Sequence, residues 1–271
     1  MRLLMRLSAR ADAAYETAYH HKLRGALWRA LEGTRFEELH DTGDPPGFVF
    51  SNVFPWGAIG EGDRRTLLVA SHDEALLSTI ARHFRDDSEL NVGEMPFRVE
   101  ELSAVSPDVG EPGTRGVIET ATGVVVRLYD HHREAFGIDG EYDETVTYWR
   151  PEHTMEPFRA AIEENAQRKH ELFAPEYVPG PATVDGELFD GYDLIKTYSL
   201  PVTVTRGVER TLVLSKWRFE YRVRNDTHRK QLNLLLDCGI GGRNALGFGF
   251  LNVDEESKRV VGKADAEAVV R

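Results

Sequence analysis

The sequence has little cysteine, little lysine and no long apolar run. Its single cysteine, Cys238, excludes an internal disulfide framework and any zinc site built on cysteines. No stretch of about 18 consecutive apolar residues occurs, which excludes a membrane-spanning helix. The N-terminal residues 1–7 carry charges within their apolar run and are expected to form a strand, not a signal peptide. With 41% hydrophobic residues, the chain is expected to be a globular cytoplasmic protein.

The charge distribution is acidic overall but uneven. Lysine supplies 7 of the 33 basic residues, aspartate and glutamate total 45, and the net charge is −12. An acidic, lysine-poor composition suits a high-salt cytoplasm, where surface acidity maintains solubility. Residues 206–243 nevertheless hold nine Arg/Lys against four Asp/Glu, and residues 1–35 hold seven against three. We expect these two segments to form one basic patch after folding, with an ordinary solvated face as the alternative.

The hydrophobic pattern predicts two successive βαββαβ units. In the first, Asp12 and Asp73 are the expected N-caps of two helices. In the second, one helix begins after Thr154, whereas the turn-rich segment 130–146 lacks periodicity and is expected to be an exposed insertion. The predicted strands span 2–10, 48–54, 65–71, 97–105, 116–129, 189–204, 210–224 and 248–253, and a further helix spans 226–237.

This order of elements gives an α+β fold class with two tandem ferredoxin-like (RRM-like) domains. The expected boundaries are 1–108 for the first domain and 114–255 for the second, with a linker rich in proline and glycine between them. The charged, alanine-rich residues from Asp254 onward are expected to fray, leaving a flexible tail at 256–271.

A glycine-rich stretch follows the last predicted helix. Its frame is G-x-G, five residues, G-x-G, and Arg243 and Asn244 lie between the two pairs. Glycine reaches positive φ and lets another backbone approach closely, which suits a loop whose N–H groups turn toward an anion. No Lys-Ser/Thr closes a Walker loop, and Asn244 occupies the third glycine position of G-x-G-x-x-G, so neither nucleotide-binding loop is present.

This loop resembles the C-terminal glycine-rich loop of the CRISPR-associated endoribonucleases that process precursor CRISPR RNA, which belong to the RAMP superfamily. Further matches follow in the same order along the chain. The Leu-Arg-Gly-Ala-Leu-Trp of residues 23–28 is similar to the family's Leu-Gln-Gly-x-Ile-Tyr. Leu-His-Asp at 39–41, a turn, and Phe-Val-Phe-Ser at 48–51 are similar to its Leu-His-x, turn, Phe-x-Phe-Ser. Asn165-x-x-x-Lys169 resembles its second-domain helix, and the acidic composition resembles the halophilic archaeal type.

The resemblance implies a metal-independent endoribonuclease that uses no cofactor and no metal. It would cut CRISPR repeat RNA within precursor transcripts to give guide RNAs, by attack of a 2′-OH that leaves a 2′,3′-cyclic phosphate and a 5′-OH. Its partners would be precursor CRISPR RNA and other subunits of a CRISPR effector complex, with no membrane. Two alternatives stay open: a non-cleaving RNA-binding subunit of such a complex, and a ferredoxin-like scaffold whose loop is only a turn.

His40 is the candidate catalytic residue. Histidine transfers protons near neutral pH, His40 lies between the first helix and a Pro/Gly turn, and it matches the family's catalytic histidine. The family's tyrosine is replaced by Trp28, and its lysine before Phe-x-Phe-Ser is replaced by Pro46. The general-acid and phosphate-stabilising roles are therefore open, with possible support from His20, Lys22, Arg24 and Trp28.

The glycine loop is expected to bind RNA phosphates through backbone N–H groups and through Arg243, which would fix the register of the bound RNA strand. The predicted RNA-binding residues are Gly239, Gly241, Gly242, Arg243, Asn244, Gly247 and Gly249. Trp217 and Tyr221 are candidates for base stacking, with core packing as the alternative. The adjacent His131 and His132 are not expected to present a metal pair on one face.

Overall fold

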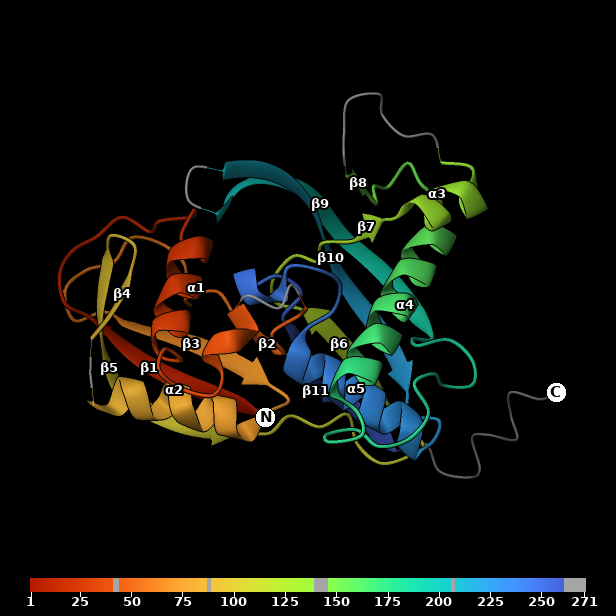
Figure 1. Cartoon of the computed structure of the whole chain (residues 1–271), viewed down its shortest axis with the longest axis horizontal. Helices are drawn as coiled ribbons and strands as arrows, with labels where there is room; N and C mark the ends of the chain where they lie inside the picture. The colour runs from red at the N-terminus through yellow and green to blue at the C-terminus, as the bar shows by residue number, and fades with distance from the viewer. Residues whose placement is uncertain (41–43, 87–88, 139–145, 206–207, 261–271) are drawn as a thin grey trace.

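The first half of the chain forms a five-stranded antiparallel sheet with two helices (Figure 1). The computed structural model describes residues 1–40, 44–86, 89–138, 146–205 and 208–260. The elements are β1 (Arg2–Ala9), α1 (His20–Arg29), the 3-10 turn η1 (Glu37–His40), β2 (Phe48–Phe50), β3 (Arg64–Ser71), α2 (Glu74–Asp86), β4 (Glu89–Val92) and β5 (Met95–Val105). The strand order is β2-β3-β1-β5-β4, so β4 is an edge strand added to the predicted four.

The second half repeats this arrangement. Its elements are β6 (Thr114–Thr120), β7 (Arg127–Leu128), α3 (Asp130–Phe136), β8 (Thr147–Tyr148), α4 (Met155–Phe173), β9 (Gly191–Thr205), β10 (Val208–Arg222), α5 (Asp226–Cys238), the 3-10 turn η2 (Asn244–Leu246) and β11 (Leu251–Val260). The main sheet has the order β11-β6-β10-β9. Both sheets thus place the last, first, third and second strand of each unit side by side, and the prediction of two tandem ferredoxin-like units is confirmed.

The helix caps agree with the sequence at one site and not at another. Asp73 accepts hydrogen bonds from the N–H groups of Ala75 (2.8 Å) and Leu76 (3.2 Å), as an N-cap does. Asp12 does not cap α1, which begins only at His20. The Asp12 carboxylate instead accepts from the N–H of Glu61 at 2.8 Å and ties two loops together.

One local prediction is incomplete and another is wrong. The segment 130–146 was expected to be an exposed insertion, and its described residues are mostly exposed, but its first seven residues form the helix α3, which is followed by a left-handed residue, Gly137, with φ 62°. The expected fraying from Asp254 is wrong within the described residues, since β11 continues to Val260 and pairs there with Thr114 of β6. Residues 261–271, the rest of the predicted tail, lie outside the described residues.

The core of the second unit contains the aromatic residues of β10. Trp217 and Phe219 are fully buried, and Tyr221 is 1% exposed. They pack in one cluster with Phe158 of α4 and Leu232 of α5. Base stacking by Trp217 and Tyr221 is therefore excluded in this structure, and the core-packing alternative is confirmed. None of the described helices combines the length and the apolar content needed to cross a membrane.

A buried arginine joins the two units. The Arg2 guanidinium of β1 donates to the carbonyl oxygens of Leu236 (3.1 Å) and Leu251 (2.5 Å) and to Oδ1 of Asn252 (2.8 Å). It also lies over the ring of Phe250 at 4.6 Å. Burial lowers the pKa of Arg2 to about 10, which still leaves it charged at neutral pH. The first strand of the chain is thus anchored to the last helix and last strand.

Candidate functional site

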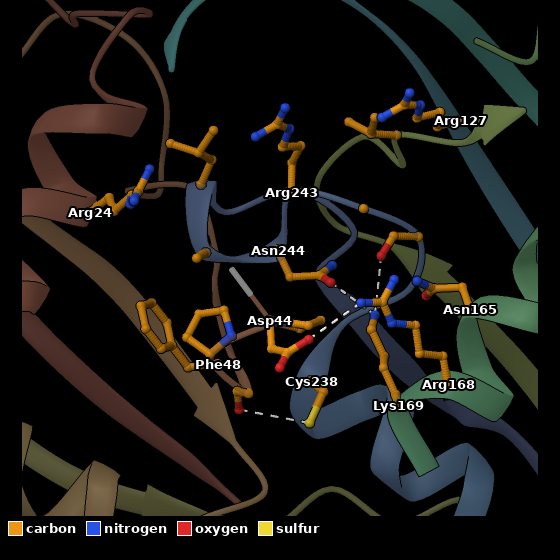
Figure 2. A pocket seen from close by; sticks show the side chains of 18 of the residues that line it. Arg24, Asp44, Phe48, Arg127, Asn165, Arg168, Lys169, Cys238, Arg243 and Asn244 are labelled. Atoms are coloured by element: carbon orange, nitrogen blue, oxygen red, sulfur yellow. Dashed lines mark hydrogen bonds and ion pairs between the residues drawn. The ribbon is translucent and has the colours of Figure 1, made fainter. Parts of the chain in front are cut away.

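The glycine-rich loop, residues 239–250, lies between the two units (Figures 1 and 2). On one side it meets the first unit, where His20 of α1 donates from Nδ1 to the Leu246 carbonyl at 2.9 Å. On the other side it meets α4, whose Lys169 points into the loop. The loop is therefore held by elements from both halves of the chain.

Lys169 forms the central contact of the loop. Its side chain is 1% exposed. The ammonium donates to the carbonyl oxygens of Gly239 (2.6 Å) and Gly241 (3.1 Å) and to Oδ1 of Asn244 (2.8 Å) (Figure 2). Burial lowers the pKa of Lys169 to about 7, an effect that the three oxygen acceptors oppose. Three acceptors match the three donors of a lysine ammonium.

Asn244 also acts inside the loop. Its amide nitrogen donates to the carbonyl oxygens of Ile240 (3.2 Å) and Phe248 (2.9 Å), and the residue is 7% exposed. Both ends of the Asn244 amide are thus used by the protein. The side chain that was expected to contact RNA instead fixes the shape of the loop.

The glycines of the loop serve close packing. Gly239, Gly241, Gly247 and Gly249 all have positive φ, and a Cβ on Gly249 would lie 1.9 Å from the Ile240 carbonyl oxygen. The N–H groups of four loop glycines donate to carbonyl oxygens within the protein. Gly239 donates to Leu235 and Gly242 to Val125, while Gly247 donates to Asn244 and Gly249 to Gly123. These four N–H groups are thus occupied within the protein, and the binding of RNA by the loop glycines stays a prediction.

Arg243 is the exposed cation of the loop. It initiates η2 with φ 61°, and it is the one non-glycine residue with positive φ in the described part of the chain. That left-handed conformation is uncommon for a residue with a side chain and often marks a functional position. Its side chain extends away from the loop, with Arg24 of α1 on one side and Arg127 of β7 on the other (Figure 2).

A cleft of about 430 Å³ opens where these side chains meet. Cations from four elements and the glycine loop line it: Arg24, Arg127, Arg168, Lys169, Arg210 and Arg243. The acid on this wall, Asp44, already forms an ion pair with Arg168 at 3.3 Å. Burial, and then the nearby charge of Arg243, lower the pKa of Arg24. Two guanidinium groups that line the same partly buried cleft can bind a phosphate.

The structure separates the four supporting candidates. Arg24 and Trp28 line the cleft, on successive turns of α1. Lys22 does not line it and pairs with Glu16 at 2.7 Å. His20 is 7% exposed, and burial lowers its pKa to about 4, so the ring is neutral at pH 7 and does not act as a proton donor there.

His40 ends η1, and its neighbour Leu39 lines the cleft. The side chain of His40 lies outside the described residues, so its catalytic role stays a prediction. Arg168 and Asn165 line the cleft, although the sequence predicts no functional role for either residue. The spacing Asn165-x-x-x-Lys169 was the available signal, because it places residues 165, 168 and 169 on one side of a helix. The Oδ1 atom of Asn165 is buried without a hydrogen-bond partner.

His131 and His132 come together in a way that the sequence did not predict. Both Nε2 atoms approach Oε2 of Glu164 on α4, at 2.8 and 2.9 Å. The Nδ1 atom of His132 accepts from the N–H of Tyr129 at 3.3 Å, so the proton of the neutral ring is on Nε2 and is donated to Glu164. A metal ligand requires a free lone pair on that nitrogen, and the geometry therefore favours a hydrogen bond over a metal ion.

Comparisons with known proteins agree with this arrangement. The model of the family "CRISPR associated protein Cas6, C-terminal" matches residues 109–253. A CRISPR-associated endoribonuclease Cas6 from Haloferax mediterranei is 64% identical over 258 residues, with 95% of each chain covered. The CRISPR-associated endoribonuclease Cas6 2 of Methanocaldococcus jannaschii is 24% identical, covering 93% of this chain and 99% of that protein. A solved structure of CRISPR associated protein Cas6 has a TM-score of 0.68 at 15% identity, covering 94% of this chain and 99% of that one, which confirms the fold.

The first prediction concerns the packing of the loop. Gly249→Ala is expected to lower the free energy of unfolding by roughly 2–4 kcal/mol, because a methyl group there meets the Ile240 carbonyl at positive φ. Gly137→Ala is the matched control, since Gly137 also has positive φ but nothing lies within 4 Å of its added Cβ. Its loss should be only about 1 kcal/mol. Denaturant unfolding measures both, and equal losses would show that contact with Ile240 does not matter.

The second prediction concerns pH. The unfolded state takes up a proton on His20 near pH 6.5, whereas the folded state does so only near pH 4. Between these values the unfolded state binds more protons on His20, so this residue alone lowers the free energy of unfolding by roughly 3 kcal/mol as the pH falls. His20→Gln should remove this contribution and make the pH dependence shallower. A wild-type slope in His20→Gln would contradict the assignment.

Proposed function

Because this chain belongs to the Cas6 family of CRISPR-associated endoribonucleases, we propose that it cuts CRISPR repeat RNA in the cleft between its two units. One observation carries the proposal. Cations from α1, β7, α4, β10 and the glycine loop converge on a single cleft in a chain of net charge −12. A concave site lined by positive charge attracts a polyanion even when the rest of the protein is acidic.

The proposed reaction is attack by the 2′-OH of the RNA on the adjacent phosphate. His40 takes the proton of the 2′-OH as general base, the new bond forms to phosphorus, and the bond to the 5′-oxygen breaks. That oxygen takes a proton from water, and the products are a 2′,3′-cyclic phosphate and a 5′-OH. The position of His40 at the end of η1, next to the cleft residue Leu39, supports this role.

Arg24 and Arg243 are the residues that we assign to the scissile phosphate. One comes from α1 and the other from the glycine loop, and each lines the cleft. Charge that develops on the phosphate during in-line attack is stabilised by fixed cations. This assignment fills the role left open by Pro46, which stands where the family has a lysine.

The third prediction tests His40. His40→Ala should bind repeat RNA with nearly unchanged affinity but cut it about 10²–10⁴-fold more slowly, because the base is lost while the cationic cleft remains. Single-turnover cleavage at matched occupancy measures the effect. Cleavage by the parent should continue in EDTA, and a 2′-deoxy substitution at the cut site should abolish it. Equal rates for parent and variant would remove His40 from the mechanism, and binding without any cleavage would favour the alternative of a non-cleaving subunit.

The fourth prediction tests the two arginines. Arg24→Gln and Arg243→Gln should each weaken binding and reduce the slope of log affinity against log salt by about 0.7, the value for one phosphate contact on a single strand. At saturating RNA, cleavage should also fall. Lys22→Gln is the matched control, because it removes the same charge from α1 at a position outside the cleft. An unchanged salt slope in the two cleft variants would exclude direct phosphate contacts.

A further inference from the structure

Three arginines form a row across the second sheet, away from the cleft. In the antiparallel register Arg222 of β10 is directly opposite Arg115 of β6, and Arg115 is directly opposite Arg259 of β11. Side chains at directly opposite positions share one face of a sheet, with Cβ atoms about 4.5–5.5 Å apart. All three residues line one hollow of about 1310 Å³.

This hollow is separate from the cleft and shares no lining residue with it. Arg115 lies near the start of β6, whereas the chain beyond the end of β6 meets the glycine loop. There the N–H of Ala121 donates to the Phe250 carbonyl, and the N–H of Gly249 donates to the Gly123 carbonyl. The row and the cleft are therefore at opposite ends of the same strand.

A bulge in β11 brings Arg259 into the row. Asp254 pairs with Val117 and Arg259 pairs with Arg115, so residues 255–258 of β11 lie opposite the single residue Gly116. The hydroxyl of Ser257, within the bulge, accepts from the N–H of Val117 at 2.8 Å. Without these extra residues a strand in regular register would place Glu256 opposite Arg115, and an ion pair would replace the arginine row.

Within the described part of the chain, the charges of the row are not neutralised. Some other surface arginines have a carboxylate partner, including Arg218 with Glu119 at 3.1 Å and Arg224 with Asp190 at 2.8 Å. Among the described residues, no carboxylate lies within ion-pair distance of any of the three arginines in the row. Like charges directly opposite each other destabilise a sheet, and a bound anion removes this cost.

The hollow as a whole is positive. Its charged lining consists of four arginines and two acids, Arg115, Arg222, Arg224, Arg259, Asp190 and Glu220. It offers little to a protein partner, because its aromatic residue, Tyr221, is 1% exposed and its exposed apolar side chains are only Pro112 and Val260. Protein interfaces are centred on buried aromatic and aliphatic anchors, whereas guanidinium forks suit phosphate groups.

We propose that this arginine row binds the phosphate backbone of the RNA at a second site, outside the segment held in the cleft. The proposal rests on the proposed function only for the identity of the polyanion. It predicts that RNA long enough to reach from the cleft to the far end of β6 gains contacts that a minimal repeat does not have. Three phosphate contacts steepen the salt dependence of single-strand binding by about 2 in log–log slope.

The test compares a minimal repeat RNA with the same repeat extended by a single-stranded flank on its 5′ side or on its 3′ side. Dissociation constants are measured over a salt series for the parent and for the double variant Arg115→Gln/Arg259→Gln. The parent should bind one extended RNA more tightly than the minimal repeat, with a slope steeper by about 2. The double variant should lose most of this gain, because only Arg222 of the row remains and the slope difference should fall to about 0.7. It should cut the minimal repeat at the parental rate.

Two further variants control for net charge and folding. Arg82→Gln/Arg85→Gln removes the same charge from α2, and it should keep the gain from the flank. Arg115→Lys/Arg259→Lys keeps the charge of the row and should retain part of the gain. An undiminished flank-dependent gain in Arg115→Gln/Arg259→Gln would overturn the proposal.

A competition experiment distinguishes RNA from an acidic protein. A polyglutamate of the same charge as the flank should compete poorly for the row, and equal competition would overturn the assignment to RNA. This test separates failure of the second site from failure of the proposed function. If the parent protein cuts no repeat RNA but still binds the flanked RNA more tightly, the proposed function fails and the second site stands. If the parent protein gains no affinity from either flank, the proposal of a second site is overturned.

Discussion

The site depends on one buried ammonium group. Removing Lys169 from water carries a large desolvation cost, which is offset only because three oxygen acceptors surround its Nζ atom. The same contacts hold the carbonyls of Gly239 and Gly241 inward. Just after these two glycines the loop turns outward at Arg243, whose backbone adopts the left-handed conformation that this turn requires. A cation inside the loop thus determines where the cation outside it is displayed.

The loop is also the point where the two units meet. A Cβ on Gly247 would lie 2.3 Å from the ring of Phe50 in β2, so only glycine allows the loop to approach the first sheet this closely. His20 forms a second contact, and its ring lies 4.6 Å from that of Phe248. Since Arg24 comes from the first unit and Arg243 from the second, these packing contacts set the distance between the two guanidinium groups. Substitutions in the apolar contact are therefore expected to act on phosphate binding without touching RNA.

The sequence predicted the duplicated fold because strand and helix periodicities differ and each half contains the same succession of them. It could not predict which donors of the glycine loop are free. Five glycines in a frame indicate a tight backbone path, but the occupied N–H groups become apparent only once Val125 and Gly123 are brought beside the loop. The short helix α3 was missed because its seven residues hold few apolar positions, although Gly137 was a readable stop signal. The cleft cations Arg127, Arg168 and Arg210 are about 40 residues apart in sequence and are joined only by topology.

The use of arginine explains how an acidic protein keeps a basic cleft. Burial, and then the nearby charge of Arg243, lower the pKa of Arg24, yet the ordinary pKa of a guanidinium is so high that the group stays charged at neutral pH. A lysine in the same place begins closer to neutrality, and the pKa of Lys169, lowered to about 7 by burial, shows how far such a shift can go. Lysine is therefore suited to the interior, where three oxygen acceptors favour its proton, and arginine to the cleft wall, where the charge must persist until a phosphate arrives. In high salt, where long-range attraction is screened within a few ångströms, a bidentate contact at short range retains its strength, and this favours arginine further.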